Sequence, residues 1–220
     1  MNILDYDAYI FDLDGTLLQS MHMWDEIYIK VLKDFNIDNA GDYLQRVNHL
    51  SLKAGAEYTV NTFNIDISVS SLVELWTKLA ADSYKNTIEL KPYARELIEY
   101  LSSHGKIMGV ATALSNELFE PCLVHQNIDK YFKAATSIDE VRRGKGFPDI
   151  YLKECEKLGA DPQKTVVLED SLKGIEGAAA GGFHTIGVWD KTSDSLKEQM
   201  KNTAERYIYS FKELLPCGEQ

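Results

Sequence analysis

The 220-residue sequence predicts an α/β fold, in which a Rossmann-like, three-layer core surrounds a parallel sheet and carries an inserted all-helical domain. Two observations support the prediction. Short, continuous apolar runs alternate with stretches of helical period, which is the pattern of βαβ units. One long stretch between the first apolar run and the second contains helical patterns alone. We expect residues 1–19 and 87–220 to form the core and residues 20–86 to form the helical insertion.

The first expected element is a buried strand at residues 8–11, and the helical insertion follows it. The insertion begins with a helix whose apolar face has the amphipathic spacing i, i+3, i+4, i+7 and i+8. That face consists of Trp24, Ile27, Tyr28, Val31, Leu32 and Phe35. Two shorter helical patterns cover residues 43–47 and 52–63. Ser71 and Glu74 have the spacing of a capping box, which predicts a helix that begins at Ser71.

Three further apolar runs have the composition of strands that are buried on both faces of a parallel sheet. They span residues 107–111, 166–168 and 185–189. Two amphipathic helices are expected beside them, each followed by a glycine that can end it. Their apolar faces consist of Tyr93, Leu97 and Leu101 in one helix and of Tyr151, Cys155 and Leu158 in the other.

Composition argues against several classes of protein. The sequence has 23 Lys and Arg residues and 34 Asp and Glu residues, which gives a formal charge of −11. This negative charge disfavours nucleic acid and anionic membranes as partners. No apolar run approaches the ~18 residues of a membrane span, and the acidic N-terminus is unlike a signal peptide. The three cysteines are widely spaced, which indicates neither a disulfide framework nor a zinc ribbon. We expect a cytoplasmic protein that is a monomer or a weak dimer.

Polar side chains suited to chemistry stand where three of the predicted strands end. Asp12 and Asp14 follow the first strand, Thr112 follows the second, and Glu169 and Asp170 follow the third. Ligands of open parallel sheets bind beyond the carboxyl ends of the strands, so we expect these side chains to face one crevice. Carboxylates in a desolvated cleft are costly unless a cation lies among them.

A magnesium ion fits this requirement, because Mg²⁺ prefers a few carboxylates, waters and phosphate oxygens. Lys145, in a Gly-Lys-Gly loop, is the cation that the protein itself offers. Such a pocket suits a phosphate group. Each motif alone has a structural explanation: an Asp-Gly turn, acids that favour a helix N-terminus, or a solvated lysine. Their joint occurrence in this order favours a magnesium-dependent phosphoryl site.

These motifs resemble those of the haloacid dehalogenase-like hydrolase superfamily over nearly the whole chain. Asp12-Leu13-Asp14-Gly15-Thr16 resembles the first motif, Thr112 the second, Lys145 the third, and Glu169-Asp170-Ser171 the fourth. The helical insertion after the first motif resembles the cap of the branch that contains phosphoglycolate phosphatase-like and β-phosphoglucomutase-like proteins. An acid at Asp14 indicates an oxygen leaving group, which needs a proton, rather than a halide.

The resemblance implies a role for each matching residue. Asp12 would attack phosphorus and form an aspartyl-phosphate, and Asp14 would act as the general acid and then as the general base. Mg²⁺ would be held by Asp12, the backbone carbonyl of Asp14 and Asp170, with Glu169 a direct or indirect ligand. The phosphoryl oxygens would be bound by a set consisting of Leu13, Asp14, Thr112, Ala113 and Lys145.

The implied activity is that of a Mg²⁺-dependent phosphatase acting on a small phosphorylated metabolite, either a sugar phosphate or a phosphoglycolate-like acid. The β-phosphoglucomutases carry a histidine where this chain has Trp24, which favours a phosphatase. A phosphomutase is the alternative, and a non-catalytic phosphometabolite-binding protein is a third hypothesis. The candidate substrate contacts of the cap are His22, Arg46, His49 and Lys53, for which a solvated helix face is the competing explanation.

Overall fold

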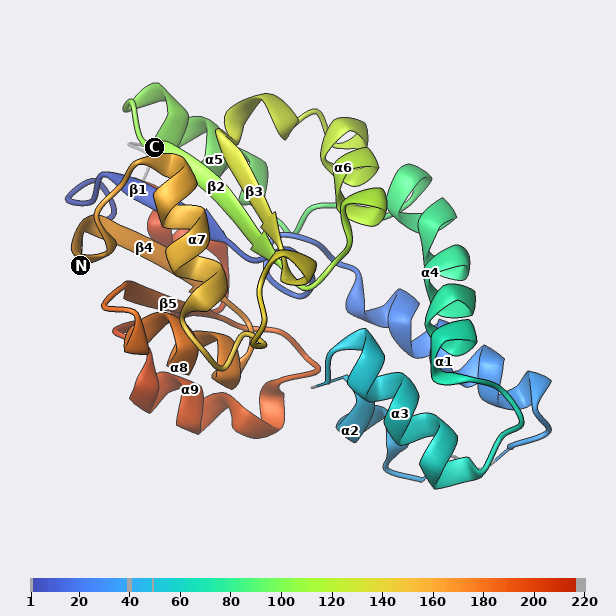
Figure 1. The fold of residues 1–220 in the computed structure, drawn as a ribbon. Coiled ribbons are helices and arrows are strands. Elements are labelled where there is room, and N and C mark those ends of the chain that lie inside the picture. The colour runs from blue at the N-terminus through green and yellow to red at the C-terminus, as the bar shows by residue number, and fades with distance from the viewer. Residues whose placement is uncertain (1, 39–40, 49, 217–220) are drawn as a thin grey trace.

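Figure 1 shows the computed structural model, which describes residues 2–38, 41–48 and 50–216. The described residues form one six-stranded sheet in the order β3-β2-β1-β4-β5-β6, and every pair of neighbours is parallel. The strands are β1 (Ala8–Phe11), β2 (Ile107–Thr112), β3 (Ala134–Ser137), β4 (Thr165–Glu169), β5 (His184–Val188) and β6 (Arg206–Ile208).

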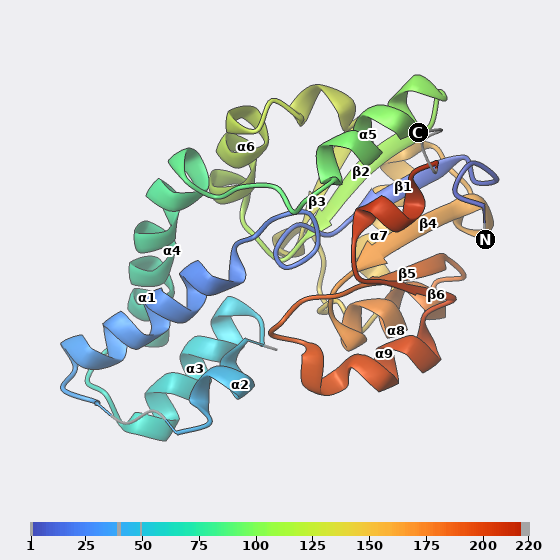
Figure 2. The same ribbon diagram turned by 180° about the vertical axis from the view of Figure 1, so that it is seen from behind.

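Helices cover both faces of this sheet, so the expected three-layer α/β core is confirmed (Figures 1 and 2). Helices α7 (Asp149–Leu158) and α8 (Leu172–Ala180) pack on one face, where Ala8 and Ile10 of β1 are buried. Helix α5 (Ala94–Ser103) lies on the other face with Tyr9 and Phe11. The remaining core helices are α6 (Asn116–His125) and α9 (Lys197–Thr203).

The four predicted strands are confirmed, but two strands at the edges of the sheet were not predicted. Strands β3 and β6 have only four and three residues, and each mixes apolar with polar side chains, so neither forms a continuous apolar run. Two of the predicted strands also ended one residue too early, since β2 extends to Thr112 and β4 extends to Glu169. Both side chains are therefore held by the sheet itself.

Of the five helices that the described residues form between β1 and β2, the first four lie beside the sheet, and we call them the cap (Figure 2). They are α1 (Met21–Asp34), α2 (Tyr43–Val47), α3 (Leu52–Phe63) and α4 (Val69–Asn86). The bounds of α2 and α3 agree with the predicted ones. The predicted start of α4 at Ser71 was wrong, because the hydroxyl of Ser68 caps the helix by accepting a hydrogen bond from the Ser71 N–H at 3.1 Å.

Tyr93 corrects a second expectation, since it does not lie on the buried face of α5. Its φ of 65° is left-handed and its side chain is 39% exposed, so it precedes the helix instead of packing under it. The buried face of α5 starts one residue later and consists of Ala94, Leu97, Ile98 and Leu101.

The two connections between the cap and the sheet are bonded to each other. The Gln19 N–H donates to the Glu89 carbonyl at 2.9 Å, and the Lys91 N–H donates to the Leu17 carbonyl at 2.8 Å. The Lys91 ammonium also forms an ion pair of 3.0 Å with Asp190, after β5. The connections therefore form a short antiparallel bridge. None of the helices in the described ranges combines the length and the apolar character needed to cross a bilayer.

Candidate active site

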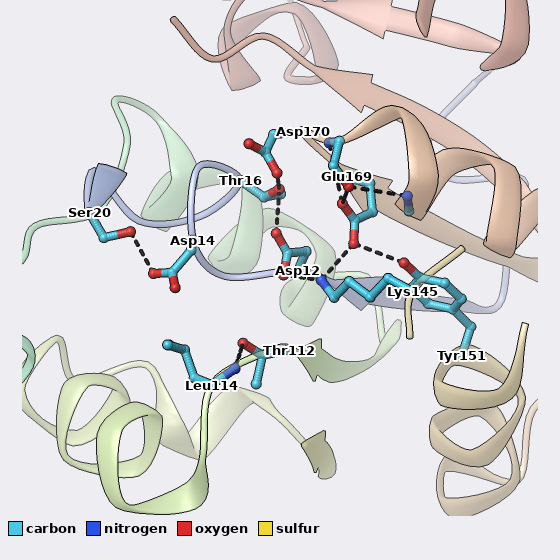
Figure 3. Close-up of polar contacts among 12 residues, drawn as sticks. Asp12, Asp14, Thr16, Ser20, Thr112, Leu114, Lys145, Tyr151, Glu169 and Asp170 are labelled. Atoms are coloured by element: carbon cyan, nitrogen blue, oxygen red, sulfur yellow. Dashed lines mark hydrogen bonds and ion pairs between the residues drawn. The ribbon is translucent and has the colours of Figure 1, made fainter. Parts of the chain in front are cut away.

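Three buried carboxylates meet at the carboxyl edge of the sheet, beyond β1 and β4 (Figure 3). Asp12, Glu169 and Asp170 each offer an oxygen, and these oxygens all lie within 4.8 Å of one another. Strands β1 and β4 are neighbours in the sheet, so their ends bring together residues that lie more than 150 positions apart in the sequence. The predicted convergence of these acids is thus present in the structure.

The loop after β1 turns sharply to make this approach possible. The Asp12 N–H donates to the Leu168 carbonyl at 3.1 Å, which continues the pairing of β1 with β4 by one residue. Gly15 has a φ of +75°, and a Cβ placed there would lie 2.2 Å from a carboxylate oxygen of Asp170. A side chain at position 15 would therefore push Asp170 out of the cluster. The Thr16 hydroxyl donates to Asp12 at 3.0 Å.

Lys145 supplies the positive charge in this cluster. Its ammonium forms ion pairs with Asp12 and, at 2.6 Å, with Glu169. Glu169 in turn accepts hydrogen bonds from the hydroxyls of Tyr151 and Ser171, both at 2.9 Å. Glu169 is thus saturated by donors and holds Lys145 in place. The role of the Tyr151 hydroxyl was not predicted, because its spacing only marked it as a core residue of α7.

The electrostatics of the cluster fit a divalent cation. Burial and the negative charge of Glu169 raise the pKa of Asp12 to about 7, against the opposing effect of Lys145. Burial and then the charges of Asp12 and Glu169 raise the pKa of Asp170 well above its usual range. Burial alone would lower the pKa of Lys145, but the two carboxylates beside it raise it, so it remains an ammonium.

One ammonium cannot balance three carboxylates, and Asp170 has the weakest partner, the Thr16 hydroxyl at 3.5 Å. No ion pair within the described ranges involves Asp170. Oxygen donors alone make up this cluster, which is the donor set that Mg²⁺ prefers. The three carboxylates therefore fit a metal site, in which Asp170 has the fewest competing partners and Glu169 the most, since its oxygens already accept from Lys145, Tyr151 and Ser171.

Asp14 lies apart from this cluster and faces the cap. Its carboxylate accepts hydrogen bonds from the hydroxyls of Ser20, at 2.5 Å, and of Tyr84, at 2.6 Å. Burial raises the pKa of Asp14, although these two donors and the indole of Trp24 oppose the effect. Neither donor was predicted as a site residue. Tyr84 lies 70 positions away in α4, where its spacing indicates only a buried helix face.

The other predicted site residues surround the loops after β1 and β2. Leu13 is fully buried, and its carbonyl accepts from the N–H groups of Thr16 and Leu18. Thr112 is buried, and its hydroxyl accepts from the Leu114 N–H at 3.1 Å. Ala113 is exposed immediately beyond β2.

The predicted substrate contacts of the cap are less well defined. His22, Arg46 and Lys53 are exposed, and Arg46 forms an ion pair of 2.9 Å with Asp42, the N-cap residue of α2. His49 lies outside the described residues. Trp24 and Trp76 are buried in the cap core, and the indole of Trp24 donates to Tyr84, which in turn contacts Asp14.

The chain is similar in sequence to a known family and to phosphatases within it. The family model described as haloacid dehalogenase-like hydrolase matches residues 9–188. The chain is 27% identical over 180 residues to a phosphorylated carbohydrates phosphatase of Thermotoga maritima, covering 82% of this chain and 83% of that one. It is 29% identical over 189 residues to hexitol phosphatase B of Escherichia coli, covering 82% of each.

Solved structures share the whole fold. CbbY from Rhodobacter sphaeroides in complex with phosphate superposes with a TM-score of 0.81, at 22% identity and with 95% and 96% of the two chains covered. A putative β-phosphoglucomutase from Thermotoga maritima superposes with a TM-score of 0.76, at 25% identity and with 94% and 96% covered. The arrangement of sheet and cap is therefore common to all three proteins.

Proposed function

This chain belongs to the haloacid dehalogenase-like hydrolase family, in the branch with a helical cap, and on that premise we propose that it is a Mg²⁺-dependent phosphatase of small phosphomonoesters. The observation that carries the proposal is the pairing of Asp12 with Lys145 beside Asp170, while Asp14 faces the cap with its own hydroxyl donors. Two carboxylates in such different surroundings are suited to two different roles.

In the first half of the proposed reaction, an Asp12 oxygen attacks phosphorus, and the bond between phosphorus and the leaving oxygen breaks. Asp14 gives its proton to that oxygen, so the alcohol leaves as a neutral molecule. Lys145 keeps the Asp12 carboxylate oriented for attack. The Thr112 hydroxyl, together with the backbone around Leu13 and Ala113, would hold the phosphoryl oxygens.

In the second half, water attacks the aspartyl-phosphate, and Asp14 accepts the proton of that water. The bond between Asp12 and phosphorus breaks, inorganic phosphate leaves, and both carboxylates return to their starting states. Asp12, Asp170 and the backbone carbonyl of Asp14 would hold Mg²⁺, with Glu169 acting through Lys145. When bound, the ion supplies positive charge that stabilises the phosphoryl oxygens in the transition state.

The substrate class proposed is a sugar or polyol phosphate, with a phosphoglycolate-like acid as the other candidate. Two of the relatives, at 27% and 29% identity, are named as phosphatases of phosphorylated carbohydrates and of hexitols, which supports the first class. The resemblance to a putative β-phosphoglucomutase keeps a phosphomutase as a second candidate. Trp24 argues against it, because its indole N–H donates to Tyr84 at 2.8 Å where the mutases have a histidine.

A panel of phosphate esters tests the proposal. We expect the purified protein with Mg²⁺ to release phosphate from at least one sugar or polyol phosphate, and EDTA or Asp12→Asn to abolish this release. No turnover of any ester, or turnover that is indifferent to EDTA and to Asp12→Asn, would contradict a metal-dependent phosphatase. Isomerisation of β-glucose 1-phosphate primed by a bisphosphate, with little free phosphate, would instead identify a mutase.

A further inference from the structure

A chain of three hydrogen-bonded side chains runs from the cap to Asp14. The indole N–H of Trp24, in α1, donates to the Tyr84 hydroxyl at 2.8 Å, and Tyr84, in α4, donates to Oδ1 of Asp14 at 2.6 Å. Trp24 is 4% exposed and Tyr84 is fully buried. Two cap helices thus act together on one carboxylate oxygen of the candidate site.

The chemistry of the side chains fixes the direction of this chain. An indole nitrogen can only donate a hydrogen bond, and a phenol carries a single proton. The oxygen of Tyr84 must therefore accept from Trp24, and its proton is left for Asp14. A fully buried phenol hydroxyl needs partners of this kind, because an unpaired one would lose its hydrogen bonds to water.

Ser20 adds a second donor to the same oxygen, at 2.5 Å. It occupies the N-cap position of α1, where a serine ordinarily accepts from the backbone of the first turn. Its side chain makes no such cap bond, and its hydroxyl donates to Asp14 instead. A local rule of helix capping is broken here in favour of a contact to Asp14, which is typical of functional sites.

Both donors point at Oδ1, so this oxygen of Asp14 acts as an acceptor. A proton that Asp14 gives or takes is therefore carried by the other oxygen, Oδ2. Asp14 cannot rotate freely about its Cβ–Cγ bond while both hydroxyls are in place, which keeps Oδ2 in one direction. Holding a reacting group in one geometry is a large part of enzymatic rate enhancement.

We propose that Tyr84, oriented by Trp24, is a positioning residue that holds Asp14 from the cap so that Oδ2 exchanges the proton. The inference rests on the proposed function, since it concerns the acid–base step of that reaction. Tyr84 bonds to Asp14 and not to the reacting atoms, so its loss should impair proton transfer to the leaving group and leave substrate binding unchanged.

The test compares esters that differ in their need for the acid. The leaving group of an alkyl phosphate is an alcohol, whose oxygen must take up a proton as its bond to phosphorus breaks. The leaving group of p-nitrophenyl phosphate is p-nitrophenolate, which departs without a proton. Tyr84→Phe removes the hydroxyl, and Trp24→Phe removes the donor that orients it. Tyr43→Phe is the matched control, because Tyr43 is also a buried cap tyrosine, but its hydroxyl is bonded to Thr59 at 2.6 Å.

Release of the leaving group is measured in single turnovers with Mg²⁺, using p-nitrophenyl phosphate and the alkyl phosphate that the wild-type protein hydrolyses fastest. We expect Tyr84→Phe to slow the alkyl ester about 10- to 100-fold, a part of the ~10²–10⁴-fold that acid–base catalysis supplies. The rate with the aryl ester should change less than about threefold, and the half-saturating concentration should stay the same for both esters. Trp24→Phe should also slow the alkyl ester more than the aryl ester, but by a smaller factor. Tyr43→Phe should leave both rates unaltered.

Equal slowing of both esters, or rates of Tyr84→Phe that match those of Tyr43→Phe, would overturn the inference while leaving the proposed function intact. Wild-type protein that cleaves neither ester would contradict the proposed function, and the inference with it. If Tyr84→Phe does not fold, the alkyl-to-aryl ratio of Trp24→Phe decides, because that variant keeps the hydroxyl and loses only its orientation.

Discussion

Asp12 and Asp14 are two positions apart in the chain, yet they face different surroundings. Asp12 is bonded to Lys145 and to the Thr16 hydroxyl, within the core. Asp14 is bonded to Ser20 and Tyr84, on the side of the cap. The intervening Leu13 is fully buried and anchors the loop between them. This alternation suits the roles proposed for the two residues, a nucleophile beside an ammonium for Asp12 and an acid beside neutral donors for Asp14.

Lys145 gives a first prediction at this scale. Lys145→Met leaves the carboxylates of Asp12 and Glu169 without their shared cation, so we expect kcat to fall about 10²–10³-fold, as for the loss of other preorganised charge donors. Steady-state kinetics on the best substrate measures this loss. The control is Lys153→Met, which removes a half-exposed lysine paired with Glu140 at 3.3 Å. A kcat within about threefold of wild type would contradict the role given to Lys145.

Glu154 gives a second prediction, which concerns stability. It is fully buried in α7, it accepts from the Thr136 hydroxyl at 2.6 Å, and burial raises its pKa above the usual 4.5. The folded protein then retains a proton that the unfolded chain releases, so the stability from this group is lost as the pH rises through its raised pKa. Lys157 and Glu140 are the charged groups that act on it.

Glu154→Gln keeps a neutral group at every pH. We therefore expect the free energy of unfolding of the variant to increase relative to that of the wild type as the pH rises above 4.5, which means that the variant becomes the more stable of the two by comparison. Urea titrations over a pH series measure this difference, with Glu156→Gln on the exposed face of α7 as the control. A difference that stays constant with pH, or that rises equally in the control, would contradict the buried neutral carboxyl.

At the scale of elements, the packing of α8 against the loop that carries Lys145 fixes the position of the ammonium. A Cβ on Gly177 would lie 1.9 Å from the backbone carbonyl oxygen of Lys145, so helix and loop touch backbone to backbone. A Cβ on Gly174 would similarly meet the Glu169 carboxylate at 2.3 Å. The absence of side chains at Gly174 and Gly177 therefore leaves room for Glu169 and for the backbone of Lys145, the two residues of one ion pair.

Gly177→Ala should therefore displace the Lys145 loop. Backbone cannot move aside as a flexible side chain can, so we expect a large loss of kcat together with a fall in thermal stability. The gain in helix propensity, about 1 kcal/mol, offsets that fall only in part. Gly144→Ala is the control within the same loop, because a Cβ there meets nothing within 4 Å. Wild-type activity in Gly177→Ala, or an equal loss in Gly144→Ala, would show that this contact does not determine the position of Lys145.

The sequence predicted the elements that have a strong periodic signal. Strand β1 and helices α2 and α3 lie where the patterns placed them. The edge strands β3 and β6 were missed because three or four half-polar residues carry no pattern, and pairing with a neighbour alone makes them strands. Ser68 was missed as the cap of α4 because Ser71 offers the same chemistry three residues later.

The site was predictable to the extent that strand ends converge by topology. Asp12, Lys145, Glu169 and Asp170 were expected together and lie together. Tyr84 could not be found in this way, because its position depends on how α4 packs beside α1 and not on any local spacing. Contacts of that kind exist only once the cap has a tertiary structure.

At the scale of the whole molecule, a sheet and a cap are joined by two connections that are bonded to each other. Because Leu17 pairs with Lys91 and Gln19 with Glu89, the connections can turn together as one hinge. The ion pair of Lys91 with Asp190 ties that hinge to the sheet. The cap also carries Ser20 and Tyr84, so a movement of the cap would change the contacts of Asp14.

We predict that residues 20–86 move as one body when a phosphate analogue binds. The angle between cap and core should differ between crystals of the free protein and crystals with Mg²⁺ and the analogue, because closure excludes water from the site. The hinge torsions should change within the connections, near residues 17–20 and 86–92. Equal angles in the two crystal forms would speak against hinge closure.

The central claim is that Asp12 receives the phosphoryl group while Asp12 and Asp170 hold the metal. A crystal structure with Mg²⁺ and beryllofluoride, a mimic of a phosphoryl group on a carboxylate, tests it most directly. We predict beryllium on an Asp12 oxygen and Mg²⁺ at ~2.0–2.1 Å from the carboxylates of Asp12 and Asp170. Beryllium on another residue, or a metal bound away from these two carboxylates, would contradict the account.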